Sequence, residues 1–180
     1  MFYGKVLITE NHNLAPGYYR LTLLAPEVAV CAKPGQFIQI RVAGSGSNDP
    51  LLARPISIFR INTAENTIAL IYKVVGRGTS ILSGLNQGTV LEIMGPVGNG
   101  FTIPPDTTKI ALIAGGVGMP PLFCFAEELV RSRLGEQIHL FYGGRSKSDI
   151  LELDLWNQLG IKVVTATEDG SMGQRGLVTE

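Results

Sequence analysis

The chain has 180 residues, of which 45% are hydrophobic and 17% are charged, so it can bury a substantial core as one large or two small domains. Fifteen Lys and Arg residues balance fifteen Asp and Glu residues, which excludes the broad positive field that nucleic acid or an anionic membrane surface would need. We therefore expect a globular protein with no nucleic-acid partner and no membrane partner.

Two cysteines, Cys31 and Cys124, are too far apart to suggest a disulfide framework or a metal-ligand pattern. They are interpreted as apolar filling in a reducing compartment. No N-terminal stretch has the layout of a signal peptide, and no apolar run approaches the roughly 20 residues that span a bilayer. These features predict a cytoplasmic location.

Short segments rich in β-branched and aromatic residues recur through the first half, separated by Gly, Pro and Asn. This rhythm predicts an antiparallel barrel or sandwich. The polar stretch 44–50 is expected to be a surface loop rather than an interdomain linker, because strands of the same character resume after it. The predicted strands are 2–11, 17–24, 36–42, 55–61, 67–75 and 89–94.

Residues 54–57 (Arg-Pro-Ile-Ser) stand at the entrance of a predicted strand. The guanidinium of Arg54 can hold a phosphate through two hydrogen bonds, and the Ser57 hydroxyl can meet a ring heteroatom. The two side chains share a side of the strand only if the backbone bulges. The alternative is a strand that starts with a proline next to an exposed arginine.

Residues 71–82 read as a strand, a glycine-rich turn and a short helix. Gly76 and Gly78 free the backbone, and either Thr79 or Ser80 is expected to cap the helix, whose N–H groups would then face a pyrophosphate. An ordinary capped turn explains the same residues.

The apolar run 109–114 ends on glycines and restarts as a helix with prolines in its first turn. A buried parallel strand can be apolar throughout, and Gly116-x-Gly118 supplies bare backbone that a phosphate can approach. Pro121 stands where the dinucleotide fingerprint has its third glycine or alanine. The alternative is a tight turn that needs glycine for its own backbone angles.

The second half alternates strands with helices, which predicts a parallel α/β unit. A basic pair, Arg145 and Lys147, follows its second strand and either accepts a ribose 2′-phosphate or lies in a solvated loop. Neither His12 nor His139 has a partner at nucleophile or metal spacing, so no catalytic side chain is predicted. The predicted elements are strand 109–114, helix 119–134, strand 137–142, helix 149–159 and strand 161–166.

In this order the motifs resemble the ferredoxin–NADP reductase superfamily, and most closely the electron-transfer subunits of dihydroorotate dehydrogenase B. The resemblance extends over the whole chain, through 95–100, 142–145 and 167–179 as well. It implies an FAD-binding β-barrel over 1–104 and a nucleotide-binding parallel α/β domain, incomplete, over 105–180.

The resemblance also implies binding residues. It assigns the flavin pyrophosphate to Arg54 and to Gly78 with Thr79, and the isoalloxazine edge to Ser57. It favours NADH over NADPH. The implied FAD residues are Arg54, Pro55, Ile56, Ser57, Ile71, Tyr72, Lys73, Gly76, Gly78 and Thr79, and the implied NAD residues are Gly115, Gly116, Gly118, Met119, Pro120, Gly144 and Arg145.

In such a family NADH reduces the flavin, which feeds a [2Fe–2S] cluster and then a dihydroorotate dehydrogenase catalytic subunit, within a heterotetramer that serves pyrimidine biosynthesis. The cluster needs four thiolates, and this chain has two cysteines. We therefore expect a truncated form, in which strand 109–114, central in the usual order 3-2-1-4-5, is left with an open edge. The alternatives are a stand-alone flavin or ferredoxin reductase, a flavoprotein subunit of a hydrogenase or sulfide dehydrogenase, and a non-catalytic FAD-binding regulatory module.

Overall fold

The structure, a computed structural model, describes residues 1–42, 49–132 and 138–180. It separates into two compact units, Met1–Gly100 and Phe101–Glu180, whereas the sequence placed the division between residues 104 and 105. Most of the polar loop predicted at 44–50 lies outside the described residues.

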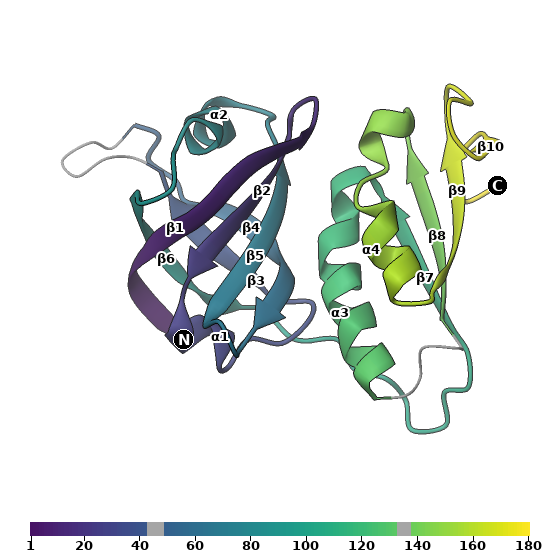
Figure 1. The fold of residues 1–180 in the computed structure, drawn as a ribbon, viewed down its shortest axis with the longest axis horizontal. Coiled ribbons are helices and arrows are strands. Elements are labelled where there is room, and N and C mark those ends of the chain that lie inside the picture. Colours follow the sequence, from purple (N-terminus) through teal and green to yellow (C-terminus); the bar gives the residue numbers. More distant parts are fainter. Residues whose placement is uncertain (43–48, 133–137) are drawn as a thin grey trace. The chain divides into compact units, whose positions relative to one another are not determined.

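The first unit is a closed antiparallel barrel of six strands in the order β1-β2-β5-β4-β3-β6 (Figure 1). The predicted barrel is thus confirmed, and the sandwich is excluded. Alternate residues of the strands point inward, as the two-residue period requires: Leu21 and Leu23, like Ile38 and Ile40, are fully buried. The strands are β1 (Phe2–Ala15), β2 (Tyr18–Leu24), β3 (Phe37–Arg41), β4 (Arg54–Asn62), β5 (Thr67–Lys73) and β6 (Val90–Val97).

Two short helices belong to this unit. The sequence missed α1 (Pro26–Ala29), a single turn with Pro26 at its start and with Val28 and Ala29 buried. The helix predicted at the end of 71–82 is present as α2 (Arg77–Ser83), and its Leu82 is fully buried.

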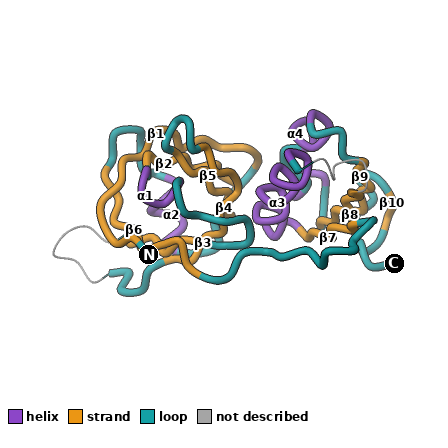
Figure 2. The backbone as a smooth tube through the Cα atoms, turned by 90° about the horizontal axis from the view of Figure 1, so that it is seen from below, coloured by secondary structure: helices purple, strands orange, loops and turns teal. Residues whose placement is uncertain are grey.

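The second unit is a parallel sheet in the order β10-β9-β8-β7, which confirms the predicted α/β class. Helices α3 and α4 lie on the same face of the sheet (Figure 2). The elements are β7 (Ile110–Gly115), the 3-10 turn η1 (Gly116–Gly118), α3 (Met119–Arg131), β8 (Ile138–Gly144), the 3-10 turn η3 (Lys147–Asp149), α4 (Leu153–Gln158), β9 (Lys162–Thr167) and β10 (Gln174–Arg175).

One face of the sheet packs against these helices, and no described helix covers the other face (Figure 2). Leu112 and Ala114 of β7 are buried, whereas Ile113 between them is 59% exposed and Val164 of β9 is 39% exposed. Among the described residues β7 pairs with β8 alone and stands at the end of the sheet, which is the open edge that the sequence expected for a strand central in the usual order.

Two predicted helices are longer than those observed. The helix predicted at 149–159 is shortened to α4, because η3 takes up its start and Glu152 adopts a left-handed backbone with φ of 57°. The helix predicted at 119–134 ends at Arg131, and residues 133–137, which include its last positions and the start of the next predicted strand, lie outside the described residues.

Candidate functional site

The backbone pairing of β4 with β5 stops before the two strands end. This leaves an opening between them at one end of the barrel, next to two of the motifs found in the sequence. The pairing of these strands ends at a rung between Ile58 and Leu70. Beyond it, β4 pairs only with β3 through residues 54–57, and β5 pairs only with β2 through residues 71–73, within the described part of the chain. Backbone N–H and C=O groups on the facing edges therefore have no ladder partner across the opening and can meet a ligand.

Arg54 stands at the outer end of β4 and meets the bare backbone of Gly78 at the start of α2. A Cβ built on Gly78 would lie 2.6 Å from Arg54 Nη2 and closer still to its Nε, so a side chain there would displace the guanidinium from this position. Arg54 Nη1 also donates a hydrogen bond to the carbonyl of Leu52. Two motifs that the sequence treated separately are thus in direct contact.

The glycine-rich turn is held by Thr79. The sequence expected Thr79 or Ser80 to cap the helix; the N-cap residue is Gly76, and Thr79 takes part as the third residue of α2 in a capping box. Its Oγ1 accepts the N–H groups of Val75 and Gly76, at 3.0 and 3.2 Å, and so fixes the turn that precedes the helix.

Arg54 and Ser57 lie on opposite sides of β4. The register of β3 with β4 runs without a shift from Arg54 to Ser57, and the irregularity of β4 comes only between Ile58 and Arg60. The bulge that would have placed both side chains on one side is therefore absent between them. A ligand that contacts both must pass from the end of the barrel, where Arg54 lies, to its outer surface.

The end of β5 offers backbone rather than side chains. Ile71 and Tyr72 are buried, and Lys73 donates a hydrogen bond of 2.8 Å to the Tyr18 hydroxyl while its ammonium lies over the Tyr18 ring. Burial raises the pKa of Tyr72 well above its usual range, and its hydroxyl stays protonated. The backbone is therefore the part of 71–73 that is left to contact a ligand.

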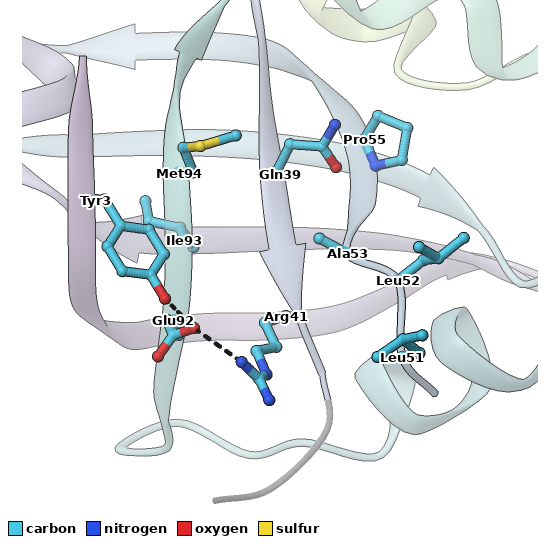
Figure 3. A pocket seen from close by; sticks show the side chains of 10 residues that line it. All are labelled: Tyr3, Gln39, Arg41, Leu51, Leu52, Ala53, Pro55, Glu92, Ile93 and Met94. Atoms are coloured by element: carbon cyan, nitrogen blue, oxygen red, sulfur yellow. Dashed lines mark hydrogen bonds and ion pairs between the residues drawn. The ribbon is translucent and has the colours of Figure 1, made fainter. Parts of the chain in front are cut away.

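A groove of about 520 Å³ runs over the outer surface of the barrel, and its lining includes Ala53 and Pro55, the chain neighbours of Arg54 (Figure 3). Leu51 and Leu52, 70% and 75% exposed, form one wall together with Ala53 and Pro55. The polar groups at the opposite end bond to one another: the Tyr3 hydroxyl donates to Glu92 at 2.7 Å, and Arg41 pairs with Glu92 at 3.7 Å. The remaining lining residues are Gln39, Ile93 and Met94.

In the second unit, two glycines of the predicted nucleotide turn are required neither by packing nor by the backbone. A Cβ built on Gly115 or Gly118 meets no atom within 4 Å, and both residues have φ values that any amino acid adopts, −124° and −77°. Gly116 differs, because its φ of 48° is left-handed. The open space over Gly115 and Gly118 is what a ligand that approaches the backbone would use.

The start of α3 offers fewer hydrogen-bond donors than the sequence suggested. Pro120 and Pro121 have no N–H, and the Met119 N–H already bonds to the carbonyl of Gly116. The side chains of Met119 and Pro120 are buried. These residues can therefore shape the turn, but their side chains do not face a ligand.

Tyr142 of β8 holds the nucleotide turn through hydrogen bonds of its hydroxyl, a role that the sequence did not reveal. Its hydroxyl lies 3.2 Å from the Gly116 carbonyl and 3.1 Å from the Asp149 carbonyl, either of which can accept its proton, and it accepts the Leu151 N–H at 3.1 Å. The Tyr142 hydroxyl contacts one residue 26 positions earlier in the chain and another 9 positions later, so no local sequence pattern signals these contacts.

The predicted residues Gly144 and Arg145 follow at the end of β8. A Cβ on Gly144 would lie 2.8 Å from Asp149 Cβ, so this glycine has a packing reason of its own. The carbonyl of Arg145 accepts the Asp169 N–H at 3.1 Å, and Ser171 Oγ accepts the Lys147 N–H at 2.7 Å. The loops after β8 and β9 are thus tied together at the carboxyl end of the sheet, where open α/β sheets bind ligands.

Comparison with known proteins agrees with the division of the chain into two units. The oxidoreductase FAD-binding domain family matches residues 7–101, and the oxidoreductase NAD-binding domain family matches residues 112–180. The electron transfer subunit of dihydroorotate dehydrogenase B (NAD(+)) from Desulforamulus reducens is 41% identical over all of this chain and 66% of its own length. The corresponding subunit from Shouchella clausii is 35% identical over 98% of this chain and 67% of its own length.

This chain belongs to the family of dihydroorotate dehydrogenase B electron transfer subunits. It spans about two thirds of the length of these relatives. The family assignment and the presence of FAD-binding and NAD-binding domains, both expected from the sequence motifs, are confirmed.

Solved structures agree with the family at the level of the fold. An NADH-dependent reduced ferredoxin–NADP oxidoreductase superposes with a TM-score of 0.81 at 26% identity, over 97% of this chain and 60% of the other. A ferredoxin reductase of carbazole 1,9a-dioxygenase superposes with a TM-score of 0.76 at 22% identity, over 97% of this chain and 54% of the other. No described helix is long and apolar enough to cross a membrane.

Proposed function

We propose that this chain is the flavin- and nicotinamide-binding part of an electron-transfer subunit that takes electrons from NADH and passes them to a dihydroorotate dehydrogenase catalytic subunit. One observation carries the proposal: the residues implied for FAD lie on both edges of the opening between β4 and β5, where Arg54 is in contact with Gly78. The relatives are named as electron transfer subunits of dihydroorotate dehydrogenase B, which supports a catalytic subunit as the partner. The heterotetramer rests on the resemblance of the motifs alone.

The residues of the first unit fit FAD. We assign the pyrophosphate to Arg54 with the backbone of Gly78, since a guanidinium forms charge-assisted hydrogen bonds to phosphate. Ser57 would meet the isoalloxazine on the outer side of β4, with the backbone of 71–73 opposite. The groove that begins at Leu52 leaves room for the adenosine end. Pro55, Ile56, Gly76 and Thr79 would shape these surfaces.

The second unit fits the pyrophosphate of NAD at the space over Gly115 and Gly118. Gly116 and Met119 with Pro120 shape the turn, and Gly144 with Arg145 borders the ribose position at the end of β8. When bound, FAD supplies the hydride-accepting chemistry. The protein's own part is to bind and orient the two cofactors, and no side chain is assigned an acid or base role.

The iron–sulfur cluster implied by the resemblance does not fit this chain. Cys31 belongs to the first unit and Cys124 to the second, and two thiolates fall short of the four that a cluster needs. Among the described residues no group of three or more His, Cys, Asp and Glu side chains could hold a metal. A cytoplasmic location is part of the proposal. The interpretation of both cysteines as apolar filling holds for the buried Cys124 and is wrong for Cys31, which is exposed.

The test is to purify the chain and to measure its flavin and its reaction with NADH. We expect a yellow protein that retains FAD rather than FMN and that passes electrons from NADH to an artificial acceptor. Absence of any flavin binding would overturn the proposal, and flavin without NADH turnover would favour the regulatory module. Co-purification with an orotate-reducing subunit distinguishes the proposal from a stand-alone reductase.

A further inference from the structure

Asn11, in the last third of β1, makes three side-chain hydrogen bonds to two other elements. Its amide Nδ2 donates to the carbonyl of Leu82 at 2.9 Å and to the carbonyl of Leu85 at 2.8 Å. Its Oδ1 accepts the Tyr72 hydroxyl at 3.3 Å. Leu82 belongs to α2, Leu85 comes after the C-cap residue Gly84, and Tyr72 belongs to β5.

These contacts tie Asn11 to the end of α2 and to the residue that follows its C-cap. The Leu82 carbonyl accepts the Leu85 N–H at 3.2 Å as well as the Asn11 amide, and the same amide also donates to the Leu85 carbonyl beyond the helix. The same amide has an acceptor left for the Tyr72 hydroxyl, whose raised pKa keeps it a donor. Among the side chains of similar size, only asparagine offers two donors and an acceptor on one planar group.

The position of α2 matters because Gly78, in its first turn, lies against the Arg54 guanidinium. Carbon placed on Gly78 would overlap the guanidinium, so a shift of the helix toward β4 would displace Arg54, and a shift away would open a gap beside it. Thr79 secures the turn at the start of α2, and Asn11 secures the carbonyls at its end.

We propose that Asn11 is a positioning residue for the pyrophosphate part of the FAD site. It is not assigned a contact with FAD. It ties the end of α2 to β1 and β5, and so holds Gly78 in its position against Arg54. The inference rests on the proposed function, because it takes Arg54 and Gly78 as the pyrophosphate contacts.

The experiment compares FAD with riboflavin, which has the same ring system but no phosphate. Apoprotein of the full 180-residue chain is titrated with each flavin, and its melting temperature is measured. For Asn11→Ala we expect about a tenfold weaker affinity for FAD, as the loss of hydrogen bonds worth ~1.4 kcal/mol would give, with the riboflavin affinity unchanged.

Asn62→Ala is the matched control. Asn62 Oδ1 also accepts two backbone N–H groups, those of Ala64 and Glu65 at 3.1 Å each, in the β4–β5 turn at the far end of that hairpin. We expect this variant to lower the melting temperature without changing the ratio of FAD to riboflavin affinity. A merely structural role for Asn11 would give the same pattern as Asn62.

Asn11→Asp provides a second test if the alanine variant does not fold. Aspartate keeps the size and the acceptor for Tyr72 but removes both donors, so the same selective loss of FAD affinity is expected. Equal weakening of FAD and riboflavin, or no weakening of either in a folded variant, would overturn the role of Asn11. Failure of the wild-type chain to bind either flavin would instead overturn the proposed function.

Discussion

At the scale of single residues, the first unit depends on the pair formed by Arg54 and Gly78. The two lie 24 positions apart and neither is informative alone, since an arginine before a proline and a glycine in a turn are both common. Their contact converts them into one surface with a fixed positive charge next to bare backbone. Such a surface suits a diphosphate better than either motif would separately.

Arg54→Ala should release flavin. Losing a charge-assisted hydrogen bond costs about 1.5–3 kcal/mol, which corresponds to a roughly tenfold to hundredfold weaker FAD affinity. Titration of apoprotein with FAD measures the change, and Arg60→Ala, at the other end of the same strand, serves as the control. A variant that keeps the wild-type affinity would remove Arg54 from the site.

Gly78→Ala should also weaken FAD binding, because the added methyl group would push the Arg54 guanidinium out of its place. Gly84→Ala is the matched control at the other end of the helix: its Cβ would lie 3.6 Å from the nearest atom, and its φ of −88° suits any residue. Flavin titration of both variants is the measurement. Equal behaviour of the two would mean that the Arg54–Gly78 contact is unimportant for binding.

At the scale of elements, the nucleotide turn between β7 and α3 separates glycines that serve the fold from glycines that leave space. Gly116 adopts a left-handed backbone, so any side chain there is strained. Gly118 has ordinary backbone angles and open surroundings, so a side chain there leaves the fold intact. Only the second position gives a clean test of nucleotide binding.

Gly118→Val should abolish productive use of NADH while FAD stays bound, because the valine side chain would fill the space assigned to the NAD pyrophosphate. Rapid-mixing measurement of flavin reduction by NADH tests this, with the FAD content as the internal control. Gly116→Val should lower the thermal stability as well. Unchanged flavin reduction in the Gly118 variant would disprove the assignment of this turn.

At the scale of the whole molecule, the second unit has an apolar sheet face and a strand edge that the described residues leave uncovered. Ile113 is 59% exposed on that face, and β7 pairs with β8 alone within the described ranges. Exposed edges and apolar faces of sheets favour association with another chain. Relatives of this family are longer by about a third of their own length.

We therefore expect this 180-residue chain either to self-associate or to show weak protection from hydrogen exchange across 109–166. Light scattering as a function of concentration and exchange mass spectrometry test the two parts. Ile113→Lys should reduce self-association, whereas Val30→Lys, at a valine of the first unit that is 79% exposed, should not. A monodisperse monomer with strong protection throughout 109–166 would contradict this expectation.

The same preparation should contain no iron and no acid-labile sulfide, because two cysteines cannot supply four thiolates. Metal and sulfide analysis of protein purified without oxygen measures this. Stoichiometric iron would contradict the ligand count.

The sequence by itself determined the fold class, the family and the order of the motifs. The two-residue period of segments such as 36–42 marks a strand with one buried face, and the glycines at 116 and 118 mark a turn between a strand and a helix, because these features depend on local backbone geometry. Strand ends and short elements were less certain: α1 was missed, and α4 is shorter than predicted because Tyr142 and η3 organise the residues before it.

Only the tertiary structure decided which motifs meet. The contact of Arg54 with Gly78, the ties of Asn11 to α2 and β5, and the support of Gly116 by Tyr142 all join residues from 24 to 74 positions apart. Barrel closure and sheet order bring these residues together, and neither leaves a local trace in the chain. The opening between β4 and β5 is likewise a property of strand pairing, because the residues that border it read as ordinary strand in the sequence.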